Sequence, residues 1–483
     1  MISFLTGSIG KTFITAFAII IFLCGRYFYE RIKKKKTHEE AMYSLIMDNS
    51  VFALIGAAVL ILILLLAGVH MGIKEIIDIK ALSTIIIAGI AGLFLMLWRN
   101  YKVNKYEDAV KLTRNYGGLL KKYPSEKHWF EHDNTEASAR NFAALERAPF
   151  RKTEFIELKK KEKKTTFPVI VDHPFSNAVI EIKDSKDMYE VPEEIKPYEN
   201  DLFKAHDTSH IYNQLNVRVK DWKLKDNKLT IETGRTTYFK SMVTNRAIDY
   251  RMKNEMTVRD ILQYGPFVPS LKESLLSNHL GFNGFIISSD NKLPLVKRKN
   301  DMSIGKNTYG PSIGASLKTM YCLDAKGNFT KEGLLKGIRK EINDELKIDE
   351  DDIKGLGEDS IIAAYRDIVE GNKPQLLFYY RINRTSKEIQ DAFTKAMKEK
   401  HENKKFIKSK EEREEEDGTK LLWIDVDKIR DTLFLQKEFY YEGKRIKSVP
   451  SATVSLILLD KALHDDWPGC VLNNGTGDIR AKQ

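Results

Sequence analysis

The sequence predicts an α/β protein with three N-terminal transmembrane helices, an α+β region after them, and a C-terminal domain of strands and helices. Two observations support this fold class. The first 100 of the 483 residues carry three long apolar runs, whereas the remainder is rich in Lys and Glu. In that remainder, short apolar strand patterns alternate with helical ones. At roughly 150 residues per domain, the length indicates two to four domains.

The apolar runs at about 8–25, 51–69 and 81–98 are the expected transmembrane helices. A bilayer span takes about 20 apolar residues, and about 17 are tolerated. The first run reaches this length only if Lys11 snorkels toward the headgroups. A signal peptide is its alternative reading, but neither a basic start nor a small-residue cleavage site is present. A buried helical hairpin in a soluble protein is the alternative for the other two runs, and their uncharged length argues against it.

Basic residues cluster at 26–36 and 99–114, beside the apolar runs. Because basic flanks stay on the cytoplasmic side, we expect a multi-pass protein of the cell (inner) membrane whose soluble part is cytoplasmic. The net charge of +11 suits lipid headgroups, nucleic acid or phosphorylated small molecules. The position of the clusters favours the lipid bilayer as partner over nucleic acid. The three helices also offer a route to a homo-oligomer.

The cysteines Cys24, Cys322 and Cys470 are too far apart to suggest a disulfide framework or a zinc site. Their small number fits a reducing compartment. After the membrane domain at 1–100 we expect a linker helix and an α+β region at 101–275, a further domain at 276–465 with a charged insertion at 384–419, and a loose tail at 466–483. Strands are predicted at 167–171, 178–182, 215–219, 229–233, 284–288, 293–297, 361–367, 375–382 and 421–426, and helices at 99–125, 331–346 and 451–464.

The helix at 331–346 carries the candidate chemistry. Its apolar residues recur at helical spacing, so one face packs on a sheet. Glu341, Asp344 and Glu345 are neighbours on the helix surface, and Glu345 falls within the apolar stripe. An inward carboxylate is costly unless it is paired, and Mg²⁺ prefers such oxygen ligands. The alternative is a charged amphipathic helix without a metal.

This segment resembles the signature of the Nudix hydrolase family, which is Gly, five residues, Glu, seven residues, then Arg-Glu-x-x-Glu-Glu-x-Gly and an aliphatic residue. The matching positions are Glu332, Glu341, Asp344, Glu345 and Ile348. Three positions depart from the signature. The first glycine stands one residue late, at Gly327. Lys340 replaces the arginine, and Lys347 replaces the second glycine.

Neighbouring segments extend the resemblance over about 236–465. The stretch 311–317, with Ser312 and Gly314, is similar to a Pro-Ser-Gly-Gly-x-Leu segment of some family members. Lys297 and Arg298 resemble the basic end of the second strand, and 371–376 resembles the turn and strand after the signature. The segments 236–239 and 244–245 are similar to a divergent branch near UDP-sugar hydrolases.

The resemblance implies an α/β/α sandwich with a mixed sheet at 276–465. It implies Mg²⁺ (or Mn²⁺) held by the catalytic carboxylates Glu341, Glu345 and Asp344. It also implies substrate contacts from the following residues: Arg298, Lys297, Lys340, Ser312 and Gly314.

Three functions stay open at this stage. The first is a membrane-anchored Nudix-type hydrolase that cleaves a nucleoside diphosphate linked to another group, by Mg²⁺-dependent attack of water on the pyrophosphate. The second is a catalytically weak nucleotide sensor that controls the membrane helices, as in a bacterial nucleotide-signalled defence effector. The third is a membrane scaffold with an incidental acidic helix.

Overall fold

The computed structural model describes the following residues: 25, 28–29, 112–134, 164–174, 179–200, 213–250, 252, 256–298, 308–403 and 418–464. The chain divides into two compact units, Met1–Tyr106 and Glu107–Gln483. Only three described residues, Gly25, Phe28 and Tyr29, belong to the first unit. The description below therefore concerns the second unit.

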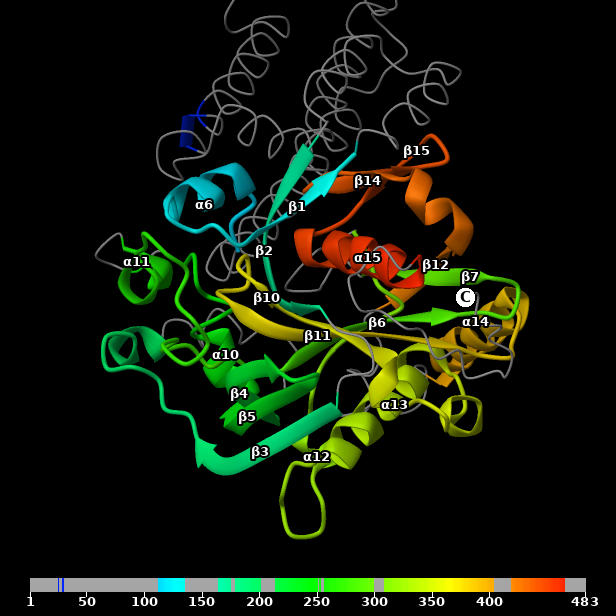
Figure 1. Cartoon of the computed structure of the whole chain (residues 1–483), viewed down its shortest axis with the longest axis horizontal. Coiled ribbons are helices and arrows are strands. Elements are labelled where there is room, and N and C mark those ends of the chain that lie inside the picture. The colour runs from blue at the N-terminus through cyan, green and yellow to red at the C-terminus, as the bar shows by residue number, and fades with distance from the viewer. Residues whose placement is uncertain are drawn as a thin grey trace, which may run out of the picture. The chain divides into compact units, whose positions relative to one another are not determined.

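A six-stranded mixed sheet forms the centre of this unit (Figure 1). Its strand order is β1–β2–β10–β11–β6–β9. Neighbouring strands are antiparallel except for β11 and β6, which are parallel. The strand bounds are β1 (Trp129–Asp133), β2 (Lys164–Pro174), β6 (Gly281–Ile287), β9 (Ile313–Ser316), β10 (Ile361–Asp367) and β11 (Lys373–Arg381).

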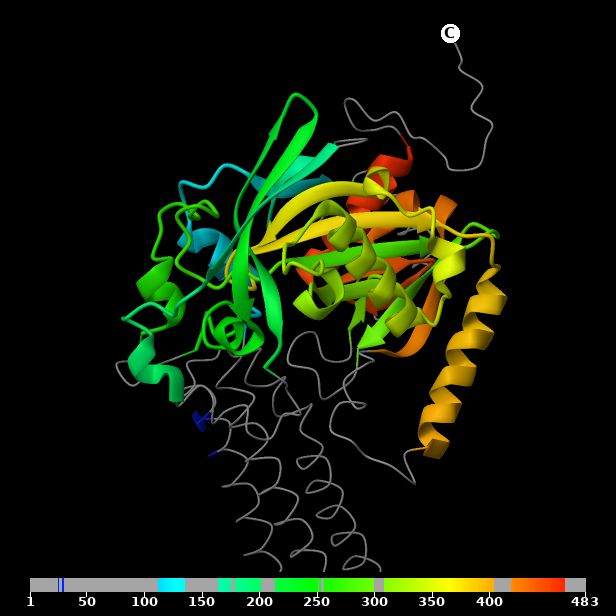
Figure 2. The same ribbon diagram turned by 90° about the horizontal axis from the view of Figure 1, so that it is seen from below.

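Two helices, α13 (Lys331–Leu346) and α15 (Pro450–Leu463), cover opposite faces of this sheet. Successive strand residues point to opposite faces, and β6 shows this directly. Its Phe282 packs in the apolar core that contains residues of α13, whereas Phe285 packs in the core that contains residues of α15. Figures 1 and 2 show the two helices apart from each other, with the strands between them.

Local signals in the sequence fix both ends of α13. Thr330 precedes the helix, and its hydroxyl accepts a hydrogen bond from the amide of Gly333 at 3.1 Å, which satisfies one of the unpaired N–H groups of the first turn. The helix ends at Lys347, whose φ of 60° lies in the left-handed region. This is the position where the family signature has its second glycine, so the lysine adopts the backbone conformation that glycine favours.

Three smaller sheets and several short helices complete the unit. The end of β4 adjoins the main sheet, because the amide of Val217 donates to the carbonyl of Leu317 and the amide of Leu280 donates to the carbonyl of Val217. The sheets are β3 (Val179–Met188)–β5 (Lys228–Thr237)–β4 (Leu215–Lys225), β12 (Gly418–Asp425)–β7 (Lys292–Arg298)–β8 (Tyr309–Gly310), and β13 (Leu433–Phe434)–β14 (Glu438–Tyr441)–β15 (Lys444–Lys447). The other helices are α6 (Tyr116–Lys122), η2 (Lys196–Tyr198), α10 (Tyr238–Met242), α11 (Val258–Leu262), α12 (Thr319–Cys322), η3 (Glu350–Ile353), η4 (Glu358–Ser360), α14 (Ser386–Asn403) and η6 (Val426–Asp431).

The structure corrects the predicted fold class. In place of three transmembrane helices followed by soluble regions, the described residues form a mixed α/β arrangement of several sheets. None of the described helices is long and apolar enough to span a membrane. The apolar helix α15 has 14 residues, fewer than the roughly 17 that a span tolerates, and it packs inside the fold. The predicted spans 8–25, 51–69 and 81–98 lie outside the described residues, except for Gly25.

The predicted regions 101–275 and 276–465 share one sheet, because β1 and β2 pair with β10. The charged insertion begins with α14, and the segments 404–417 and 465–483 lie outside the described residues. Of the helix predicted at 99–125, the described part contains α6, and 99–111 is again outside. The other predicted strands and helices coincide with β2–β7, β10–β12, α13 and α15.

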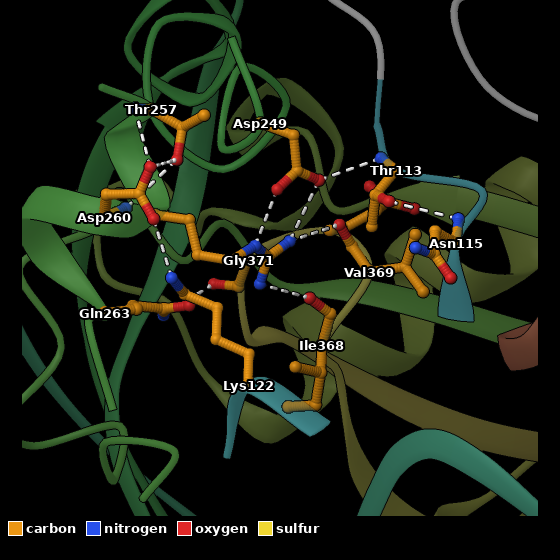
Figure 3. Close-up of polar contacts among 12 residues, drawn as sticks. Thr113, Asn115, Lys122, Asp249, Thr257, Asp260, Gln263, Ile368, Val369 and Gly371 are labelled. Carbon is orange, nitrogen blue, oxygen red and sulfur yellow. Dashed lines mark hydrogen bonds and ion pairs between the residues drawn. The ribbon is translucent and has the colours of Figure 1, made fainter. Parts of the chain in front are cut away.

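Buried side chains from earlier in the chain hold the turn between β10 and β11 (Figure 3). Arg259 of α11 is only 2% exposed. Its guanidinium donates to the carbonyl oxygens of Ile368 at 3.0 Å and Val369 at 3.3 Å. Its Nε lies 2.7 Å from the Oδ1 of Asp249. One guanidinium therefore neutralises a carboxylate and satisfies two turn carbonyls at the same time.

We predict that Arg259→Met lowers the free energy of unfolding by about 3–5 kcal/mol, because it leaves Asp249 without its cation and two carbonyls without a donor. Chemical denaturation of the full chain measures this loss. Arg445→Met is the matched control, since Arg445 is half exposed and pairs with Glu438 at the surface. Its loss should stay below about 1 kcal/mol. Equal losses in the two variants would refute the role given to Arg259.

Candidate functional site

The structure brings two of the predicted carboxylates to the β9 edge of the main sheet. Glu341 of α13 is buried and lies 3.1 Å from the Nζ of Lys318, which follows β9. Glu345, one turn later, accepts a weak hydrogen bond from the amide of Gly314 in β9 at 3.4 Å. The two partners lie four residues apart along one segment. The structure thus places Glu341 and Glu345 beside the segment that contains Gly314.

The third carboxylate, Asp344, is also buried, and its partner comes from α13 itself. The Nζ of Lys340 lies 2.7 Å from Asp344 Oδ1. Lys347 donates to the backbone carbonyl of Asp344 at 2.6 Å. The residue that replaces the arginine of the family signature therefore pairs with one of the three acidic residues.

These carboxylates do not fit a bound divalent cation as they are arranged. Mg²⁺ requires oxygen ligands at about 2.0–2.1 Å in near-octahedral geometry. Glu341 and Asp344 instead face lysine ammonium groups, and Glu345 faces a backbone amide. Throughout the described ranges, no group of three or more His, Cys, Asp or Glu side chains could hold a metal ion. Lys318 and Lys340 instead pair with Glu341 and Asp344.

The three other predicted substrate residues, Ser312, Lys297 and Arg298, lie in different surroundings. Ser312 is fully buried, donates to the carbonyl of Pro294 at 2.7 Å and accepts from the amide of Ile286 at 3.2 Å, so its role is to join strands. Lys297 lies on β7, between β12 and β8. Arg298, at the end of β7, lies close enough to Glu370 for its charge to act on that carboxylate.

A polar strand face lies beside the β9 edge, and the sequence reasoning missed it. We define the polar face as Asn216, His279, Asn283, Lys373 and Gln375, all of them buried. The pairing register places them together. His279 pairs with Arg218, Asn216 pairs with Lys318, and Gln375 pairs with Gly281. Paired residues project from the same side of a sheet. The alternate residues of these segments, including Val217, Leu280 and Leu376, enter the apolar core with α13.

Several polar atoms on this face have no hydrogen-bond partner within the described part of the chain. They are both side-chain polar atoms of Asn216, both ring nitrogens of His279 and the Oε1 of Gln375. Each such buried atom costs about 1–3 kcal/mol, and native proteins contain few of them. Gly281 supplies the space, since a Cβ there would meet Gln375 Oε1 at 2.2 Å and Lys373 Cε at 3.0 Å. The unpaired donors and acceptors of the polar face are therefore concentrated next to the space beside Gly281.

Charged groups border the polar face at the end of β10 and the start of β11. Glu370 lies 3.3 Å from the Nζ of Lys373 and 3.9 Å from the Nε of Arg246. Burial raises the pKa of Glu370, but the charges of Lys373, Arg246 and Arg298 outweigh it and hold that pKa below its ordinary value. Burial holds the pKa of His279 well below its usual range, so its ring is neutral at neutral pH.

The segments 236–239 and 244–245, noted for their resemblance, lie next to this face. The ring of Tyr238 is 6.5 Å from the ring of His279, and Arg246 lies over the Tyr238 ring at 5.3 Å. Asn245 donates to the carbonyls of Glu370 and Gly371. Polar or small residues alternate at 279, 281 and 283 and again at 373 and 375. This alternation in otherwise apolar strands was the available signal for the polar face.

No family model matches this chain, and no curated protein matches it. Among solved structures, the crystal structure of DR0079 from Deinococcus radiodurans is similar at 14% sequence identity. The match has a TM-score of 0.18 and covers 31% of this chain and 68% of that one. A TM-score this low supports no argument about fold or function.

Asp367, at the end of β10, provides a test of the electrostatics beside the polar face. Burial raises the pKa of Asp367 to about 6, and the charge of Glu370 adds to the increase. Above pH 6 the side chain is charged in both states and the folded state carries the penalty. That penalty disappears as the pH falls toward the unfolded value near 4.

We predict that Asp367→Asn raises the free energy of unfolding at pH 7 by roughly 2–3 kcal/mol relative to the unaltered chain, because it removes a buried charge. The gain should shrink steadily between pH 6 and pH 4. Denaturation at a series of pH values measures it, with Asp391→Asn on the exposed face of α14 as control. A gain that does not depend on pH would contradict the assignment.

Proposed function

We propose that this chain binds a nucleoside diphosphate derivative on the polar face, beside the β9 edge to which α13 brings Glu341 and Glu345, without a bound divalent cation. The observation that carries the proposal is the set of unpaired donors and acceptors on the polar face. Imidazole and amide groups are neutral and offer both donors and acceptors. They suit the hydrogen-bonding edge of a base or sugar better than a phosphate group.

The charged groups beside the face suit the other half of such a ligand. Three cations, Arg246, Arg298 and Lys373, act on Glu370, and Lys373 also acts on Asp367. When both carboxylates are ionised, these groups together carry a net charge of +1. A diphosphate supplies the missing negative charge and accepts hydrogen bonds from guanidinium groups. The resemblance to the Nudix family independently favours a ligand of this class.

The ligand reaches the polar face only after a rearrangement of side chains. The side chains of Gln375 and Lys373 lie beside Gly281, and all residues of the polar face are buried. Both are long side chains with several rotatable bonds, and we propose that they rotate away from Gly281 to admit the ligand. On binding, the unpaired atoms of the protein form hydrogen bonds to the ligand. These hydrogen bonds offset the free-energy cost of moving the side chains.

Mg²⁺-dependent hydrolysis of the same ligand is the second candidate. It is favoured by the position of Glu341 and Glu345, one helical turn apart beside the β9 edge. It requires Lys318 to leave Glu341. The two candidates share a ligand class and differ in whether a product appears.

We predict that Gln375→Leu weakens binding of the preferred nucleoside diphosphate derivative about tenfold, the loss expected from removing one or two hydrogen bonds from a buried site. The full chain is titrated calorimetrically with a panel of these compounds, with and without Mg²⁺. Gln390→Leu is the matched control, because Gln390 lies on α14 and bonds to Trp423. Its affinity should equal that of the unaltered chain.

Product formation is followed by chromatography in the same samples. Binding without product supports the proposed function. Mg²⁺-dependent product that disappears in Glu345→Gln supports the second candidate instead. Absence of binding to every member of the panel, or equal affinities of Gln375→Leu and Gln390→Leu, would refute the site proposed on the polar face.

A further inference from the structure

The buried carboxylate of Glu341 obtains its counter-ion from a different segment of the chain. The Glu341 side chain is only 5% exposed, and the Nζ of Lys318 lies 3.1 Å away. Lys318 stands at the N-terminal end of α12, directly after β9. A carboxylate buried to this degree is stable as an anion only with a cation beside it. The fold therefore supplies that cation itself.

The second pair is made within α13, in an arrangement that helix geometry does not favour. Lys340 precedes Asp344 by one turn, and this order is the weaker one for oppositely charged pairs on a helix. The pair is nevertheless close, at 2.7 Å, and Asp344 is only 10% exposed. The burial of the carboxylate thus accounts for the pairing better than helix propensity does.

One aromatic ring joins the two lysines. The Nζ of Lys318 lies 5.2 Å and the Nζ of Lys340 lies 5.7 Å from the centre of the Tyr321 ring. Each ammonium group is attracted by the negative face of that ring. Tyr321 belongs to α12, which packs against α13. The ring therefore keeps both ammonium groups close to the carboxylates that they neutralise.

The three carboxylates in the C-terminal half of α13 have three lysines beside them. Glu341, Asp344 and Glu345 contribute three negative charges. Lys318, Lys340 and Lys347 contribute three positive charges within the same cluster. A divalent cation gains little from a neutral cluster, and it must displace at least one ammonium group to reach two carboxylates.

We infer that Lys318 and Lys340 act as internal counter-ions that keep divalent cations out of this site. The residue types of a metal site are present on α13, but the chain fills the cation position with its own side chains. Removal of the two ammonium groups should convert α13 into a site that binds a divalent cation through Glu341 and Glu345. The inference goes beyond the proposed ligand and does not depend on it.

The test measures binding of Mn²⁺ alone to the full chain, from the electron paramagnetic resonance signal of the free ion. The unaltered chain should show a dissociation constant weaker than about 1 mM. The double variant Lys318→Met, Lys340→Met should bind at least about tenfold tighter. The matched control is the double variant Lys336→Met, Lys354→Met, which loses the same charge from two exposed positions and should bind like the unaltered chain.

Lys340→Met alone is the second variant, in case the double variant does not fold, because Lys340 is 39% exposed and Glu341 keeps its partner. Its Mn²⁺ affinity should also rise, and the further change Glu345→Gln should abolish the gain. Tight Mn²⁺ binding to the unaltered chain that Glu345→Gln removes would overturn the inference. A folded variant that gains no affinity beyond the control would overturn it as well. No nucleotide is present, so neither outcome depends on the proposed function.

Discussion

Hydrogen bonds from distant side chains to the turn between β10 and β11 are the constraint on which the arrangement of this region depends. Arg259 and Asn245 both donate to backbone carbonyls of the turn, and Gln263 donates to Gly371 as well. These donors come from the segment 245–263, more than a hundred residues earlier in the chain. The turn in turn fixes the start of β11. The positions of Lys373 and Gln375 therefore follow from contacts that are distant in sequence.

The same turn explains why polar residues are tolerated inside the sheet. Gly371 and Asn372 both have positive φ, at 65° and 69°, conformations that glycine and asparagine adopt at least cost. Asn372 accepts from Arg366 at 2.9 Å, and Arg366 also pairs with Asp172 of β2. Each charged group of the turn has a partner of its own. Unpaired polar atoms of Asn216, His279 and Gln375 lie on the neighbouring polar face.

Local patterns in the sequence predicted the elements better than their assembly. The alternating apolar residues of β6, β10 and β11 and the helical spacing in α13 are properties of short segments, and the structure confirms them. The pairing of β2 with β10 joins residues almost 200 positions apart, and nothing in either strand specifies that partner. The domain boundary expected near 275 follows the sequence pattern, whereas the main sheet extends across it.

In the candidate site, too, local sequence patterns predicted some features and missed others. Helix spacing was sufficient to bring Glu341, Asp344 and Glu345 to one region of α13, and the expectation that an inward carboxylate needs a partner was physically sound. Spacing indicated Glu345 as the inward residue, whereas Glu341 and Asp344 are the buried ones. The identity of the partner could not be read from the helix, because Lys318 reaches Glu341 across the end of β9.

A lysine and a divalent cation can both neutralise a buried carboxylate, but their chemical consequences differ. An ammonium group neutralises one negative charge, whereas a bound divalent cation can also lower the pKa of a coordinated water molecule and polarise a phosphoryl oxygen. A site neutralised by lysines therefore retains the means to stabilise α13 but has no activated water. On the polar face, the described part of the chain offers no hydrogen-bond partner to the side chains of Asn216 and His279. Because these groups are neutral, they need further hydrogen-bond partners and not a counter-ion. The acidic helix is thus electrostatically complete within the chain, and the polar face is the part of this region that depends on a ligand.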